Sequence, residues 1–103
     1  MGNAGSDYAL FRRALLTKSV SQIEAAARQL PTVSLDDALS ILIVLAEKRD
    51  PRYPRAAARW AARATSELGL SVDQSRRALA LVEVLPEAPE AMRLMLLDLV
   101  RRR

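Results

Sequence analysis

The sequence predicts an all-α protein of about six helices, and three observations support this fold class. Half of the 103 residues are hydrophobic, and Ala, Leu and Arg, which favour helices, are abundant. Apolar residues recur at intervals of three and four along much of the chain. The one β-branched run, Ile41–Val44, lies inside a longer helical pattern. A chain of this length can bury a core without disulfides or metals, so we expect a folded protein.

The beginning of the chain predicts a short leader and a first helix. Residues 1–6 are mostly small and polar, and we expect a disordered leader there, followed by a single helical domain over residues 7–103. A first helix is expected over Asp7–Lys18, because its apolar side chains recur on one face. Those side chains are Tyr8, Phe11 and Leu15.

Cap and break residues delimit the second helix. Ser19 or Ser21 is expected to cap it, and Ser21 with Glu24 matches a capping box. Pro31 is expected to end this helix after Leu30, since proline cannot continue the hydrogen-bond ladder.

The third helix is predicted to be the central element of the fold. It opens at Ser34, and Asp36 and Asp37 place two carboxylates in its first turn, where the helix dipole favours negative charge. Ala38–Ala46 is apolar nearly all round, which predicts burial nearly all round. The helix is expected to end near Arg49, because two prolines follow.

The fourth helix is expected over Pro54–Leu68. Proline suits the first turn of a helix, and Gly69 can take the left-handed conformation that closes one. Alanines fill most of this helix and permit close packing around Trp60. We expect that indole to anchor the core, with its N–H near the rim.

Two further helices complete the chain. Ser71 is expected to cap the fifth helix, with Gln74 completing a capping box, and Pro86 is expected to end it. The last helix is expected over Pro89–Arg102.

An internal similarity relates two helix pairs of the chain. Residues 34–68 and 71–102 each hold two helices joined by a proline-containing turn. Together with the pair over residues 7–30, they make three hairpins. Such repetition is typical of helical solenoids, but unrelated hairpins also share it. The sequence therefore predicts either a HEAT-like helical-repeat stack or an orthogonal bundle.

The composition argues against most catalytic chemistry. The chain contains no cysteine and no histidine, which excludes disulfides, zinc sites of the usual kind and nucleophilic relays built on either residue. Three glycines cannot form a glycine-rich phosphate loop. No pair of carboxylates is spaced for acid–base work. We therefore expect a non-enzyme with no cofactor, no metal and no small-molecule substrate.

Targeting signals are also missing from the sequence. The first residues lack a basic region followed by an apolar stretch, and no apolar run approaches the roughly 20 residues that span a bilayer. We expect a cytoplasmic protein without a membrane partner.

Arginines form a stripe on the fourth helix. The chain carries a net charge of +4, and Arg52, Arg55, Arg59 and Arg63 recur at intervals of three and four. This stripe could contact phosphates or an acidic protein. It could equally be a solvated face, with Glu67 pairing back onto Arg63 and with arginine simply reflecting a G- and C-rich genome.

Residues 65–79 resemble a helix-turn-helix DNA-binding motif, with Arg76 and Arg77 on the second helix. Two positions depart from the motif: Thr65 and Ser75 stand where it prefers apolar residues. An ordinary helix stop followed by an ordinary N-cap explains the same stretch.

The last helix carries more apolar residues than one inward face requires. The expected inward stripe is Met92, Met95, Leu96, Leu99 and Val100. Leu94 and Leu97 are then left over, which favours a partner surface unless the first hairpin covers them. The sequence therefore predicts a protein–protein interaction or scaffold module without catalytic activity, bound to a protein partner or to a second copy through this helix. The alternative is a DNA-binding accessory protein that uses the arginine surfaces.

Several segments resemble a group of small uncharacterised helical proteins from actinomycete bacteria. They are Val33–Leu39, Leu45–Glu47, Asp50–Tyr53 and Arg55–Arg63. The likeness covers roughly residues 10–90, and its most specific part is the Asp-Pro-Arg-Tyr turn leading into Ala-Ala-x-Arg-Trp. The resemblance implies a bacterial cytoplasmic protein and nothing about chemistry.

Overall fold

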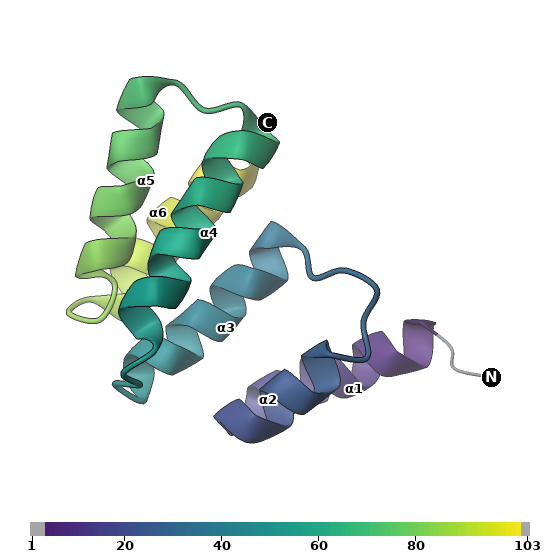
Figure 1. Cartoon of the computed structure of the whole chain (residues 1–103). Helices are drawn as coiled ribbons and strands as arrows, with labels where there is room; N and C mark the ends of the chain where they lie inside the picture. The colour runs from purple at the N-terminus through teal and green to yellow at the C-terminus, as the bar shows by residue number, and fades with distance from the viewer. Residues whose placement is uncertain (1–3, 102–103) are drawn as a thin grey trace. The chain divides into compact units, whose positions relative to one another are not determined.

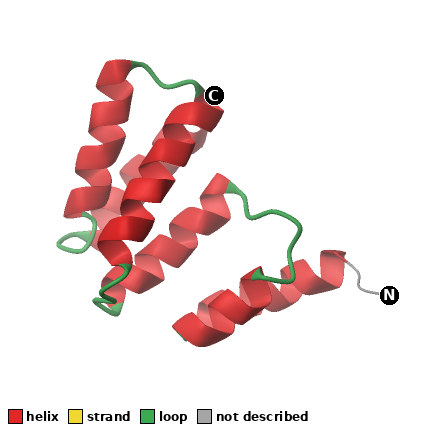
Figure 2. Cartoon of the chain, viewed as in Figure 1, coloured by secondary structure: helices red, strands yellow, loops and turns green. Residues whose placement is uncertain are grey.

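The structure, a computed structural model, describes residues 4–101 and confirms the all-α prediction (Figures 1 and 2). Within that range six helices and no strand are present. The helices are α1 (Ala4–Thr17), α2 (Val20–Ala27), α3 (Leu35–Glu47), α4 (Tyr53–Leu68), α5 (Val72–Val84) and α6 (Pro89–Arg101). None of these helices is both long enough and apolar enough to cross a membrane.

Helical structure begins before the expected start of the folded domain at residue 7. Helix α1 begins at Ala4, so residues 4–6 are helical, and the rest of the expected leader lies outside the described residues. The chain divides into two compact units, one ending at Ser34 and the other starting at Leu35. The first unit contains α1 and α2, and the second contains α3 to α6.

A tight turn joins the two helices of the first unit. Lys18 takes a left-handed conformation with φ of 57°. The Thr17 hydroxyl donates to the Ala14 carbonyl at 2.6 Å and accepts the Ser19 N–H at 3.1 Å. The Ser19 side chain then accepts the Gln22 N–H, so Ser19 and not Ser21 caps α2.

The four helices of the second unit contact one another in a ring. Helix α4 packs against α3 and α5, and α6 packs against α5 and α3. Figure 1 shows α4 and α5 side by side. Helix α3 is the most buried element, as its composition predicts. Its buried residues are Leu35, Asp37, Leu39, Leu42, Ile43, Val44, Leu45 and Ala46.

The predicted caps of α4 and α5 are confirmed. Gly69 follows α4 in the left-handed conformation, with φ of 62°, and its N–H donates to the Thr65 carbonyl. Ser71 and Gln74 form the expected capping box at the start of α5, with hydrogen bonds of 2.8 and 3.1 Å. These local signals set the helix boundaries.

Trp60 ties α4 to the start of α3. Its indole is buried, as expected of a core anchor, and Nε1–H donates to the Leu35 carbonyl at 3.0 Å. The expectation that this N–H lies near the rim is wrong, because the hydrogen bond itself is buried.

Tyr53 ties α4 to the end of α5. Its hydroxyl donates to the Val82 carbonyl at 2.6 Å, and both groups are buried. In a regular helix that carbonyl would accept the N–H of the residue four positions on, but that residue is Pro86, which has none. The tyrosine therefore supplies the donor that the helix cannot.

The Tyr53→Phe variant is expected to lower the free energy of unfolding by about 1–3 kcal/mol, because it leaves the buried Val82 carbonyl without a donor. Chemical denaturation of the full chain at neutral pH measures this change. A variant as stable as the wild type would show that water satisfies the carbonyl instead.

The same tyrosine predicts a loss of stability at alkaline pH. Burial raises the pKa of Tyr53 from 10.0 to about 12, so the folded state holds its proton after the unfolded chain has lost it. The stabilising contribution is complete below pH 10 and is lost as the pH rises toward 12. Between pH 10 and 12 the free energy of unfolding, measured by chemical denaturation at each pH, should decrease more steeply with pH for the wild type than for Tyr53→Phe. Equal slopes would contradict the prediction.

Arg49 offers a stabilising substitution. It follows α3 with φ of 52°, a conformation that costs an L-residue about 1–2 kcal/mol. Glycine removes this cost, but it also gives the unfolded chain more conformational entropy, which offsets part of the gain. Arg49→Gly is therefore expected to raise the free energy of unfolding by about 0.5–1 kcal/mol. Ala62→Gly, within exposed α4 surface, is the matched control and should cost about 1 kcal/mol. Thermal unfolding that shifts downward for both variants would refute this assignment.

Candidate functional site

The arginine stripe of α4 begins with an intramolecular ion pair. Arg52 donates from Nε and Nη2 to the two carboxylate oxygens of Asp50, each at 3.0 Å, and from its backbone N–H to Oδ1 at 2.8 Å. These hydrogen bonds, the side-chain ones first, hold the pKa of Asp50 below its ordinary value. The Arg52 guanidinium is therefore already engaged by a carboxylate before any partner arrives.

The remaining arginines of the stripe fall into two kinds. Arg63 forms an ion pair with Glu67, which confirms that expected pairing. Arg55 and Arg59 are exposed, and no hydrogen bond or ion pair of either is found within residues 4–101. The stripe therefore offers two available guanidinium groups in place of the four expected.

The residues that resemble a helix-turn-helix form an antiparallel hairpin instead. At one end of the pair Tyr53 bonds to Val82, and at the other end the hydroxyls of Thr65 and Ser75 are hydrogen-bonded at 3.1 Å. Helices α4 and α5 thus lie along each other (Figure 1). A helix-turn-helix motif needs its two helices to cross at about 90–120°, so the segment 65–79 does not build one.

The two candidate DNA-contacting arginines have different surroundings. Arg76 and Arg77 are both exposed on α5. Arg77 also lines a depression of about 280 Å³ that includes Met95 and Asp98 of α6. Because Asp98 lines the same depression, its negative charge opposes the approach of a phosphate, which weakens the case for nucleic-acid binding there.

The exposed apolar residues of helix α6 differ in part from those expected. Leu94 is 62% exposed, as predicted, whereas Leu97 is half-buried. Met95, expected in the inward stripe, is 50% exposed, and Leu96 beside it is fully buried. The reason is that α6 packs against both α3 and α5, which turns Leu96 to the centre of the buried face.

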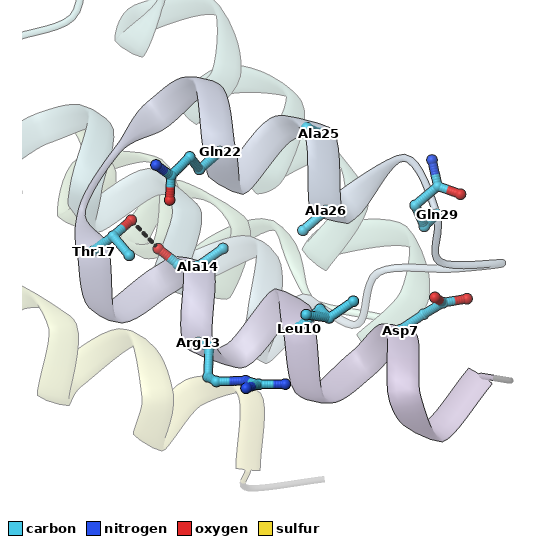
Figure 3. A pocket seen from close by; sticks show the side chains of 9 residues that line it. All are labelled: Asp7, Leu10, Arg13, Ala14, Thr17, Gln22, Ala25, Ala26 and Gln29. Atoms are coloured by element: carbon cyan, nitrogen blue, oxygen red, sulfur yellow. Dashed lines mark hydrogen bonds between the residues drawn. The ribbon is translucent and has the colours of Figure 1, made fainter. Parts of the chain in front are cut away.

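Sequence reasoning missed a groove in the first unit. It lies between α1 and α2 and has a volume of about 480 Å³ (Figure 3). Its lining comprises Asp7, Leu10, Arg13, Ala14, Thr17, Gln22, Ala25, Ala26 and Gln29. The signal available in the sequence was the spacing of small and amide residues along α2 and the turn after it, at intervals of three and four.

Comparison with known proteins adds no functional assignment to these surfaces. Over the described range, no group of three or more potential ligand residues (His, Cys, Asp or Glu) is placed to hold a metal ion. No protein-family model, no curated protein and no solved structure matches the chain.

Proposed function

We propose that the protein is a protein–protein interaction module whose contact surface is the outward face of α6. The observation that carries this proposal is the exposure of two adjacent large apolar residues, Leu94 and Met95, on a helix that buries its opposite side. Apolar surface of this kind, rimmed by polar residues, is typical of a binding site.

The charges around Leu94 indicate the partner. Glu83, Glu87 and Glu90 are exposed at and beside the turn between α5 and α6. Glu90 and Asp98 stand four residues before and after Leu94 and so share its face of the helix. The suited occupant is therefore a protein segment with an apolar anchor flanked by basic residues.

A second copy of the chain is a poorer occupant of this surface. Pairing two α6 helices across a two-fold axis would bring Glu90 and Asp98 of the two copies together, and like charges at a contact oppose association. We therefore favour a partner of opposite charge over the self-association expected through Leu94 and Leu97.

The arrangement of the second unit supports this choice of surface. In a HEAT-like stack, α3 would pack on α5 and α4 would pack on α6. The contact of α6 with α3 instead supports a closed four-helix bundle. A stack binds partners on its concave side, whereas a closed bundle offers only the outer faces of its helices. Binding at the arginine surfaces has less support, since carboxylates already engage Arg52 and Arg63.

The α6 surface can be tested by placing a photo-crosslinking residue at position 94 in the native cell. A discrete protein adduct is expected from position 94 and none from exposed Ala80 of α5. The captured protein, once purified, should bind the wild-type chain. Its affinity should fall at least about tenfold for Leu94→Glu, which places a charge in an apolar contact.

Two further variants separate apolar from electrostatic contributions. Glu90→Lys should weaken the same complex and reduce its salt dependence, because the partner's basic residues then meet a positive charge. Leu16→Glu is the control, since it places the same charge on an exposed leucine of α1. A purified partner that binds Leu94→Glu as tightly as the wild type would exclude the α6 surface.

A further inference from the structure

The groove of the first unit has a floor of small residues beside one large apolar side chain. Ala14 of α1 and Ala25 and Ala26 of α2 line it, and Leu10 of α1 stands among them (Figure 3). Leu10 is 51% exposed, so this leucine is still largely in contact with solvent. The small side chains leave room for an apolar group to approach the two helices closely.

Charges of opposite sign flank Leu10 symmetrically. Asp7 precedes it by three residues and Arg13 follows it by three, and both line the groove. Neither side chain makes a hydrogen bond or ion pair within the described part of the chain. Each lies about 4.5 Å along the helix axis from Leu10, in opposite directions. Along this face of α1, a negative, an apolar and a positive side chain therefore follow one another.

We propose that this groove binds the same groove of a second copy of the chain. In an antiparallel arrangement of two α1 helices, a two-fold axis beside Leu10 brings the two leucines together. The same axis brings Asp7 of each copy level with Arg13 of the other, so the contact forms twice. An interface of this kind is self-complementary, which is the requirement for a symmetric dimer.

The charge pattern distinguishes this surface from the other exposed apolar residues. The charges four residues before and after Leu94, Glu90 and Asp98, share one sign and oppose pairing of two copies, whereas those three residues before and after Leu10 are opposite and favour it. Leu16 is more exposed than Leu10, at 83%, but does not line the groove. The dimer does not depend on the partner proposed for α6.

The charge pattern allows a swap experiment on the full chain. Sedimentation equilibrium should show a dimer for the wild type. Asp7→Arg and Arg13→Asp should each weaken dimerisation at least about tenfold, because each places two like-charge contacts in the interface. The double variant, Asp7→Arg with Arg13→Asp, should restore it. Asp7→Arg with Arg12→Asp has the same composition but points its new carboxylate about 100° away around the helix, and should not restore it.

Replacing exposed leucines by glutamate completes the test. Leu10→Glu should abolish the dimer, whereas Leu16→Glu and Leu94→Glu should leave it intact. Far-UV circular dichroism checks that each variant keeps its helices, and added salt should weaken the wild-type dimer modestly. A monomeric wild type, or a charge swap that fails to restore dimerisation, would overturn the proposal. A dimer lost only with Leu94→Glu would overturn it as well, and would make a second copy the occupant of α6.

Discussion

The second unit depends on the hydrogen bond between the Tyr53 hydroxyl and the Val82 carbonyl. Pro86 ends α5 and allows the chain to turn back, but it deprives that carbonyl of its helical donor. Tyr53 restores the donor from the first turn of α4. Trp60, two turns later on the same helix, bonds to Leu35 of α3. Helix α4 is thereby fixed to both of its neighbours, and the turn after α5 can place α6 against α3.

Helix boundaries in this chain follow from local chemistry, which explains why the sequence predicts most of them. A glycine in the left-handed conformation ends α4, and a serine with a glutamine begins α5. Both signals act within four residues and need no knowledge of the rest of the chain. The burial of α3 follows in the same way, because a helix that is apolar on every side has no solvated alternative.

The three predicted hairpins, α1 with α2, α3 with α4 and α5 with α6, are all in contact. The packing of α4 on α5 and of α6 on α3 could not be predicted, because it rests on contacts between distant residues. A glycine stop and a serine cap occur in a hairpin as well as in a helix-turn-helix. What separates the two is the Tyr53–Val82 bond, across 29 positions. The rotation of α6 has a similar origin: packing on α3 and α5 places Leu96 at the centre of the buried face and leaves Met95 half-exposed at its edge. The division of the chain into two units could not be predicted either, because neither the composition nor the length of the sequence indicates it.

Both proposed binding surfaces are inferred from how charges are distributed around exposed leucines rather than from the net charge of the chain. A net charge of +4 favours the arginines as binding residues, but Asp50 and Glu67 form ion pairs with two of them, Arg52 and Arg63. The informative charges are those that flank exposed leucines, of like sign around Leu94 and of opposite sign around Leu10. One pattern suits a basic partner and the other a second copy, and they lie on different units. A dimer built through the first unit would carry two copies of the α6 surface. Because linked sites bind a bivalent target more tightly than separate ones, the two surfaces together would make the chain a scaffold.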